Sequence, residues 1–487
     1  MAHNIAGIIN NNSDQALTYQ NQWFEMGSPD GDVPAEIPPG TSATFQASGF
    51  LGCSGWIQYQ TTAGWSLYFA FSNPTVGLNG IDVGTGTDIW DDMTGQYYGL
   101  ERIFNVTAAG EFLRVRMLST GGDSTATWDL DTVDVSIIVP AAPQLPDVLS
   151  AYNALPLDGV RTYYGCRVEP TTLAGLARSH FKGMSFFDDK LILTHTNLGG
   201  GSDDVLGKIV NLDRPENLIN PGQGMSNSTS DTTVPGWSHP CSSQACGSFL
   251  AMGLQENAES TTSIVQIYDN RAALINGSGN PIATINIADG VNGVGLTKQT
   301  DATGGKYVVA AVNGQTLQFF ASVNPQLDVT TPANNTFEPV GTPITNFQDS
   351  GAGLALITQG DGTLFAVALN ANDDGSNNTC NLYEISGDFT AVKQVETKTM
   401  TIPGISDCVS RLETLAPGLP TPFNLIFAAL LAAYGEDQLN TSFRWGKGLS
   451  IQGDGSLAVY ATDRNAIPWS QIPLLKLWDD FSVVQWG

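Results

Sequence analysis

The sequence predicts an all-β protein, with a β-sandwich at the N-terminus followed by a six-bladed β-propeller; five or seven blades are the alternatives. The first observation is a near-repeat in which residues 356–370 return 93 positions later as residues 449–463. Each copy has an apolar run, a Gly-Asp-Gly turn and a second apolar run, which is the pattern of a β-hairpin. The second observation is composition, because 53 glycines and only 14% charged residues fit a chain rich in strands and turns.

The propeller is assigned to residues 160–487, because hairpins recurring at a fixed period indicate an array and 93 residues suit two blades. In each blade a small residue, a glycine and alternating apolar residues indicate the innermost strand, where blades crowd the axis. We expect these strands to begin near Lys182, Cys246, Gly293, Gly351, Ser410 and Trp445. The blade at Ser410 has the weakest pattern, since residues 423–434 also fit a helix.

The sandwich is assigned to residues 1–139, which contain short strand patterns separated by turns. Residues 65–71 alternate, so that Trp65, Leu67, Phe69 and Phe71 fall on one face of a strand. Three prolines within residues 140–146 remove ladder donors and define a linker over residues 140–159, with a short helix over 147–157. The tryptophans expected in the sandwich core are Trp23, Trp56 and Trp65.

Charge limits the partners of this chain. The net charge is −27, and ten acidic residues but no Lys or Arg precede Arg102. Phosphate backbones and anionic lipids need cationic contacts, so the sequence argues against nucleic acid and favours a neutral or zwitterionic lipid or a glycan. The chain starts without a signal-peptide pattern and has no apolar run long enough to be a transmembrane segment. We expect a soluble, secreted protein.

Metal and thiol chemistry have little support in the sequence, and we predict no cofactor. Cys241 and Cys246, and likewise Cys380 and Cys408, form either disulfides or buried free thiols. Zinc bound by His239 with the first pair is a minor alternative, because only three ligands are local. Calcium at the turn of residues 372–377 is another, without a matching downstream acid.

Candidate site residues come from the placement of the scarce cations. Motifs of serine hydrolases, zincins, nucleotide hydrolases and dinucleotide enzymes do not occur. The starts of inner strands converge on one mouth of a propeller, where focused positive charge attracts an anion or stabilises developing negative charge. The residues expected there as ligand-binding groups are Arg178, Lys182, Arg411, Arg444, Trp445 and Lys447. His180, His239 and Glu413 are the acid/base candidates if the protein is an enzyme; structural ion pairs are the alternative.

A second candidate site lies in the Gly- and Asp-rich stretch of residues 84–99. Trp90, Tyr97 and Tyr98 lie in this stretch outside any strand pattern. Loop aromatics bind sugar faces or lipid head groups, or else pack under their own loop.

The N-terminal part resembles a known group of proteins. Residues 8–17 are rich in asparagine, residues 37–45 contain a Pro-Gly turn, residues 55–59 and 67–71 are aromatic strands, and Asn73 opens an Asn-Pro-x-x-Gly-x-Asn motif. In this order they resemble the aegerolysin and actinoporin-like β-sandwich group. The resemblance implies a lectin-like or lipid-binding protein of the toxin or defence type.

Together these features predict a binding protein whose sandwich recognises a neutral lipid head group or glycan, with the propeller as a second recognition surface. The alternative is a propeller hydrolase, lyase or isomerase that acts on a small anionic or carbonyl-bearing molecule.

Overall fold

The computed structural model describes most of the chain, and the account below is confined to those residues. They are 3–75, 80–87, 89, 100–105, 111–120, 125–134, 142–166, 180–187, 190–198, 205–213, 227–231, 237, 239–256, 262–269, 281–327, 332–349, 353–404, 440–464, 467–469 and 478–487.

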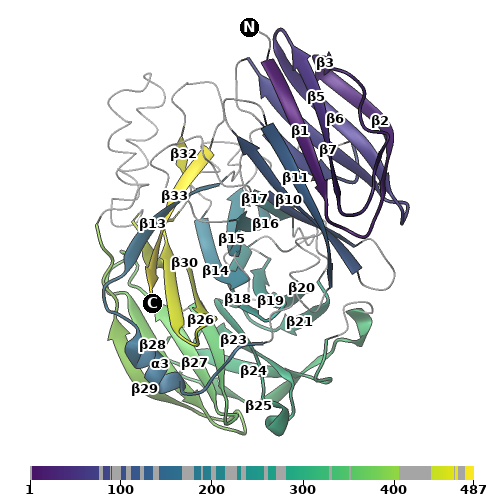
Figure 1. Ribbon diagram of the computed structural model, residues 1–487. Coiled ribbons are helices and arrows are strands. Elements are labelled where there is room, and N and C mark those ends of the chain that lie inside the picture. Colours follow the sequence, from purple (N-terminus) through teal and green to yellow (C-terminus); the bar gives the residue numbers. More distant parts are fainter. Residues whose placement is uncertain are drawn as a thin grey trace.

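The fold is all-β, as predicted (Figure 1). The α-helix α3 (Val148–Ala154) and the short 3₁₀ helices η1 (Asp301–Thr303) and η2 (Pro332–Asn334) lie between strands. No helix among the residues described is long and apolar enough to cross a membrane.

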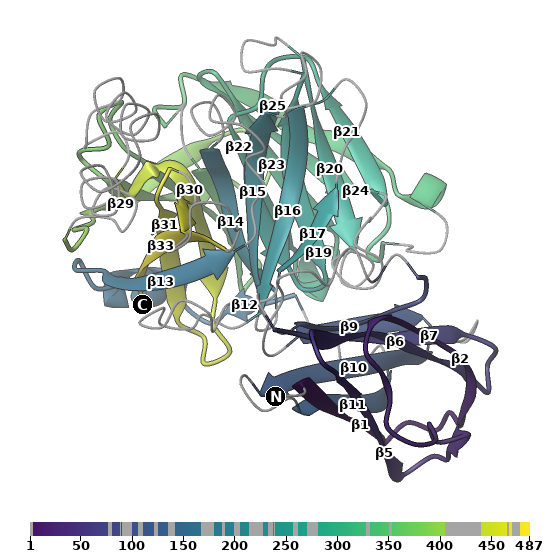
Figure 2. The same ribbon diagram turned by 90° about the horizontal axis from the view of Figure 1, so that it is seen from above.

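Two sheets form the sandwich. The first has the order β3 (Ser28–Pro29), β5 (Thr41–Gly49), β1 (His3–Asn11), β11 (Thr125–Asp134), β10 (Glu111–Thr120) and β9 (Leu100–Asn105). The second has the order β4 (Glu36–Ile37), β2 (Leu17–Met26), β6 (Gly52–Thr61), β7 (Ser66–Pro74) and β8 (Gly80–Gly84). Figures 1 and 2 both show these strands grouped to one side of the remaining sheets.

The sandwich core lies between the two sheets and contains Leu67, Phe69 and Phe71, as their alternation predicts. Trp128 of β11 packs against Phe69 and donates a hydrogen bond from its indole nitrogen to the carbonyl of Asp82, 3.0 Å away. That bond satisfies the polar atom of a fully buried tryptophan.

The described part of the propeller contains five antiparallel groups of strands, of which the first and the last are joined into one larger sheet by the parallel pairing of β14 with β30. The first four are β14 (His180–Phe187), β15 (Lys190–Leu198), β16 (Val205–Asp213) and β17 (Asn227–Asp231); β18 (His239–Cys246), β19 (Phe249–Gln255), β20 (Ser263–Asp269) and β21 (Ala283–Ile287); β22 (Gly293–Lys298), β23 (Tyr307–Asn313), β24 (Thr316–Ser322) and β25 (Phe337–Thr345); and β26 (Gly353–Gln359), β27 (Leu364–Asn370), β28 (Thr379–Ile385) and β29 (Val392–Thr399). The last comprises β30 (Ser442–Ile451), β31 (Leu457–Thr462), β33 (Trp478–Trp486) and β13 (Val160–Cys166), with β32 (Ile467–Trp469) paired to β33.

The inner strands β14, β18, β22, β26 and β30 contact one another in a ring that returns to β14. Crowding explains their glycines: a Cβ on Gly448 would lie 1.7 Å from the carbonyl oxygen of Met184. The sixth blade expected at Ser410 lies outside the described residues, and the count of six stays a prediction.

Two details of the predicted register are wrong. The two copies of the near-repeat form the hairpins β26–β27 and β30–β31 in sheets that pack directly on one another, not two blades apart. The inner strand of the second sheet begins at His239, whereas Cys246 ends it. The sequence of β18 is largely polar, so it lacks the alternation of apolar residues that identifies the other inner strands.

The stretch predicted as a linker packs on the propeller. The expected helix is present as α3, and β12 (Gln144–Leu145) pairs in parallel with β26. Tyr152 of α3 is buried and its hydroxyl donates to the carbonyl of Cys380. Strand β13 then pairs antiparallel with β33, so the start of the propeller sequence joins its end in one sheet.

Candidate functional site

The described cations predicted from the sequence do converge. Lys182 of β14, His239 of β18, and Arg444 and Lys447 of β30 line one cavity of about 510 Å³, called here the basic cavity. Lys182, His239 and Arg444 lie near the starts of their inner strands, and Lys447 joins them because β14 and β30 run parallel with Gly183 opposite Lys447. The cavity is also lined by Cys241, Ser242, Asn292, Gln348, Asp349, Asn370, Ala371, Asp373, Thr379 and Phe443.

Burial changes the charge of the cavity lysines. Lys447 is only 7% exposed, and burial with the nearby charge of Lys182 lowers its pKa to about 7. The pKa of Lys182 is lowered as well, chiefly by burial. Two ammonium groups side by side in a site of low dielectric repel each other, so one of them readily gives up its proton.

His239 is a neutral imidazole at pH 7. Burial lowers its pKa to about 4, and the charge of Lys182 adds to that effect. Its ring centroid lies 5.5 Å from that of His180, which in turn lies 5.8 Å from Trp445. His239 therefore adds no positive charge to the cavity at neutral pH.

Arg444 and Trp445 lie together at the start of β30. The guanidinium of Arg444 lies 4.7 Å from the centre of the Trp445 ring, and that of Arg464 lies 5.0 Å from it. Nη1 of Arg444 and Nε1 of Trp445 are buried donors without a hydrogen-bond partner among the residues described. A buried donor without an acceptor is costly, so a ligand that accepts a hydrogen bond from Arg444 would be stabilised.

Asp349 is a cavity residue that the sequence did not identify. Its carboxylate accepts hydrogen bonds from the hydroxyl of Tyr383, 2.6 Å away, and from the side-chain amides of Asn370 and Asn381. These donors hold it in place and satisfy its oxygens. The partners come from β27 and β28, and no local motif around Asp349 indicates them.

The other predicted site residues are not all placed. Arg178, Arg411, Glu413, Trp90, Tyr97 and Tyr98 lie outside the described residues. Within the described part of the chain, no group of three or more metal-ligating side chains occurs, and Cys241, Cys246 and Cys380 are buried free thiols. The disulfide between Cys241 and Cys246 is therefore wrong, and the thiol alternative holds.

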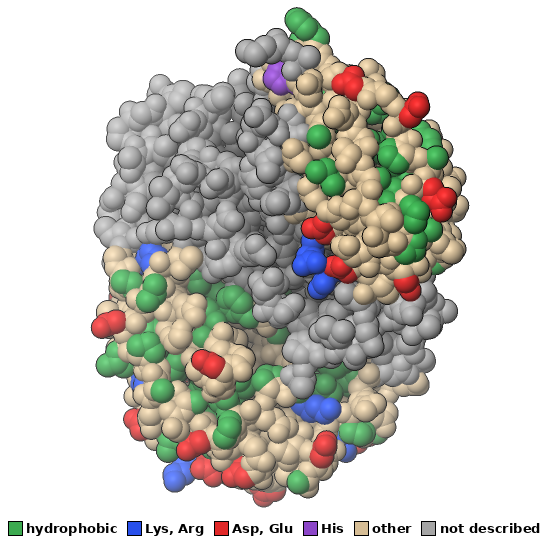
Figure 3. Space-filling view, viewed as in Figure 1, with side chains coloured by type: hydrophobic (Ala, Val, Ile, Leu, Met, Phe, Trp, Pro, Cys, Tyr) green, Lys and Arg blue, Asp and Glu red, His purple; other side chains and the backbone are tan. Residues whose placement is uncertain are grey.

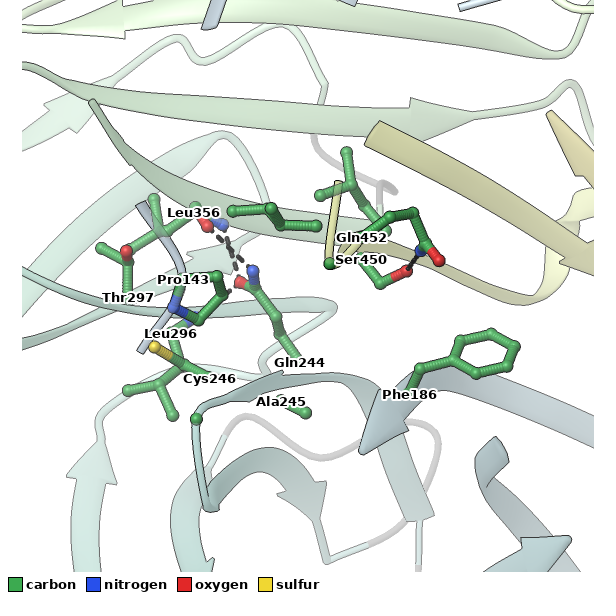
Figure 4. A pocket seen from close by; sticks show the side chains of 14 residues that line it. Pro143, Phe186, Gln244, Ala245, Cys246, Leu296, Thr297, Leu356, Ser450 and Gln452 are labelled. Atoms are coloured by element: carbon green, nitrogen blue, oxygen red, sulfur yellow. Dashed lines mark hydrogen bonds between the residues drawn. The ribbon is translucent and has the colours of Figure 1, made fainter. Parts of the chain in front are cut away.

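A second pocket of about 350 Å³ contains residues from the opposite ends of the inner strands (Figure 4). Gln244 crosses it, donating to the carbonyl of Leu356 and accepting from the amides of Leu296 and Leu356 at 2.7–2.8 Å. Both ends of its amide are satisfied, so this side chain ties three inner strands together and leaves little polar capacity for a ligand.

The sandwich carries an aromatic cluster on its outer face, formed by Trp23, Trp56 and Tyr68 and called here the aromatic platform. The indoles of Trp23 and Trp56 stack with centroids 6.3 Å apart, and Tyr68 meets Trp56 edge-on at 4.9 Å. Trp23 is 40% exposed, and Trp65 is 38% exposed. The prediction that Trp23 and Trp65 lie in the sandwich core is thus wrong, whereas Trp56 is buried, with 7% exposed, in a small separate cluster with Ala70 and Ile89.

The platform has polar and apolar neighbours. Asn21 pairs with Gln58 on the adjacent strands, and the amide of Gln58 donates to Ser66 at 3.1 Å. At the turn between β5 and β6, Phe50 is 81% exposed and Leu51 is 67% exposed. In Figure 3 the acidic side chains on the sandwich, at the upper right, stand apart from one another, whereas several lie close together along the lower edge of the view.

No family model matches the chain, and no curated protein matches its sequence. Solved structures similar to the chain include the lipid-binding protein Nakanori, at 13% identity over 27% of this chain and 71% of that chain, with a TM-score of 0.21. A lectin of Xerocomus chrysenteron matches at 12% identity over 27% of this chain and all of that chain, with a TM-score of 0.20. An α-L-arabinanase of Penicillium chrysogenum, solved with arabinobiose, matches at 10% identity over 80% of this chain and 92% of that chain, with a TM-score of 0.26. These low identities and scores assign no function.

Proposed function

We propose that this is a defence- or toxin-type binding protein whose sandwich recognises a neutral lipid head group or a glycan, with the propeller as a second recognition surface. The aromatic platform carries the proposal. An exposed indole stacks on the apolar face of a sugar or on a choline cation, and the amides beside it bind hydroxyl groups. The absence of Lys and Arg before Arg102 argues against anionic partners.

Replacing Trp23 tests this role. Trp23→Ala removes the exposed ring, and we expect at least a tenfold weaker binding, about 1.4 kcal/mol, to the preferred ligand. Glycan arrays and flotation with phosphatidylcholine or sphingomyelin vesicles separate the two ligand sources. Trp65→Ala is the matched control, because it removes an equally exposed tryptophan in the turn between β6 and β7. Equal binding by both variants, or no binding to either ligand class by the parent, contradicts the proposal.

Replacing Phe50 and Leu51, in the turn between β5 and β6, distinguishes a lipid ligand from a glycan. Phe50→Ser combined with Leu51→Ser removes two exposed apolar side chains that would insert among lipid head groups. A lipid-binding sandwich loses vesicle flotation in this variant, whereas a glycan-binding one keeps its affinity on the array.

The second recognition surface is the basic cavity, where we propose that a small anionic or carbonyl-bearing molecule binds. Lys182, Lys447 and the unsatisfied Nη1 of Arg444 support this part of the proposal, because they present donors and positive charge in one cavity. Catalysis on such a molecule is the alternative function, and neutral His239 is the acid/base group that favours it. Equilibrium dialysis with labelled pyruvate tests binding, and an Arg444→Met variant should bind about tenfold less tightly.

A further inference from the structure

The basic cavity holds cations that its own carboxylates do not neutralise. Lys182 and Arg444 both line it, and neither forms an ion pair within the part of the chain that the structure describes. Of the two lining acids, Asp349 accepts hydrogen bonds from three uncharged side chains, and Asp373 is exposed. An anion that enters the cavity would therefore be attracted by both cations at once.

A third cation acts on the same place. Arg464, two residues after β31, and Arg444 hold their guanidinium groups 5.0 and 4.7 Å from the ring of Trp445. Burial lowers the pKa of Lys182, and the positive charges of Arg444 and Arg464 lower it further. The three charges are thus close enough to act on one bound group. Because the attraction to each cation grows with the charge of the ligand, this arrangement favours a doubly charged anion over a singly charged one.

Arg444 presents a donor that suits a phosphate oxygen. Its Nη1 is buried and has no hydrogen-bond partner, and its position over Trp445 restricts the plane of the guanidinium. A guanidinium offers its N–H groups as a rigid fork that matches two oxygens of a phosphate. The ammonium of Lys182 adds a second, more compact positive group. A phosphate would therefore satisfy a buried donor that is costly to leave unpaired.

The cavity has room for more than a phosphate group. Its volume of about 510 Å³ lies within the range of pockets that bind small molecules, about 300–1,000 Å³. Gln348 and Thr379 also line it, and their amide and hydroxyl groups both donate and accept hydrogen bonds. A substituent that carries hydroxyl groups fits such a lining.

We propose that the basic cavity binds the dianionic phosphate group of a small phosphomonoester, an inference that rests on the proposed function of this cavity as an anion site. The phosphate lies between Arg444 and Lys182, and hydroxyl groups of its substituent face Gln348 and Thr379. A phosphate monoester loses its second proton near pH 6 and carries almost two charges at pH 7.5. A sulfate monoester has the same tetrahedral shape and carries one.

A matched series of ligands tests the charge preference on the unaltered full chain. Titration calorimetry at pH 7.5 compares glucose 6-phosphate, glucose 6-sulfate and glucose, which share one sugar and differ in charge. We expect glucose 6-phosphate to bind at least tenfold more tightly than glucose 6-sulfate, and glucose to bind more weakly still. Equal affinities for the two esters overturn the preference for a dianion.

Variants locate the bound phosphate. Arg444→Met and Lys182→Met should each weaken the binding of glucose 6-phosphate at least tenfold, whereas Lys393→Met, at an exposed lysine of β29, should leave it unchanged. Arg444→Lys keeps the charge and loses the fork, so an intermediate loss is expected, and it guards against simple misfolding. Unchanged binding by both methionine variants of the cavity places the phosphate elsewhere and overturns the site.

Pyruvate separates this inference from the proposed function. If pyruvate binds in the cavity and glucose 6-phosphate does not, the cavity remains an anion site and the phosphomonoester is wrong. If neither binds, the proposed function of the cavity fails as well.

Discussion

At the scale of single residues, the molecule places several ionisable groups where water is scarce. Lys447 and Asp463 are the clearest examples, and each has a pKa displaced toward its neutral form by burial. Such groups reduce stability in the pH range where they would be charged in the unfolded chain. Buried ionisable side chains of this kind either serve a function or, through their hydrogen-bond partners, fix how neighbouring strands are arranged.

Replacing Lys447 should stabilise the fold at neutral pH. The pKa falls from 10.5 in the free side chain to about 7 in the folded protein, so between these values the unfolded chain binds more protons and stability rises with pH. At pH 7 the lowered pKa of Lys447 reduces the free energy of unfolding by roughly 4 kcal/mol. Lys447→Met should therefore raise the melting temperature at pH 7, with the gain vanishing above about pH 10; Lys393→Met is the control. A pH-independent difference contradicts this account.

Replacing Arg161, which is paired with Asp463, should destabilise the fold, in contrast to replacing Lys447. The Asp463 carboxylate accepts from Thr441 and Ser482 and lies 3.7 Å from Nη1 of Arg161, while burial raises its pKa to about 6. Arg161→Met leaves a buried carboxylate without a counter-ion and should cost about 3–5 kcal/mol at pH 8. The loss should shrink below pH 6, as the carboxyl takes up a proton.

Chemical denaturation at pH 8 and pH 5 measures this difference. The double variant with Asp463→Asn removes both charges, so it should recover part of the stability lost at pH 8. A loss of equal size at both pH values would show that packing of the arginine, not charge, is responsible.

At the scale of elements, the inner strands depend on glycine because neighbouring blades approach to backbone contact. Gly448→Ala places a Cβ 1.7 Å from the Met184 carbonyl oxygen, and moving β14 from β30 should cost about 1–3 kcal/mol or more. Gly453→Ala, in the turn of the same hairpin, meets nothing within 4 Å and should change the free energy of unfolding by less than about 0.5 kcal/mol. Thermal unfolding of the two variants makes the comparison.

At the scale of the whole molecule, the sandwich core and the propeller cores contain separate sets of residues. We therefore expect the fragment of residues 140–487 to fold by itself. The fragment 160–487 should be several kcal/mol less stable, because it lacks the buried side chains of Leu145, Val148 and Tyr152. Urea denaturation of both fragments checks this. Equal stability would mean that β12 and α3 add nothing to the propeller.

Much of the fold could be predicted from local patterns, and the failures have physical causes. The alternation at Leu67, Phe69 and Phe71 identified a core strand because those side chains face a single apolar interior. The same alternation misplaced Trp65, because β7 begins only at Ser66 and Trp65 lies in the preceding turn, where it is 38% exposed. The start of the second inner strand at His239 was missed because polar residues there are satisfied by neighbouring strands, a contact no local window contains.

The sequence by itself determined the all-β class, the propeller hairpins and the identity of several cations near the inner strand starts, because these depend on alternation, turn residues and scarcity of Lys and Arg. Only the tertiary structure decided that Lys182 and Lys447 share one cavity, that Asp349 is held there, and that Trp23 faces outward on the sandwich. These are properties of side chains brought together from distant strands, and proximity, burial and the resulting pKa changes exist only once the sheets have packed.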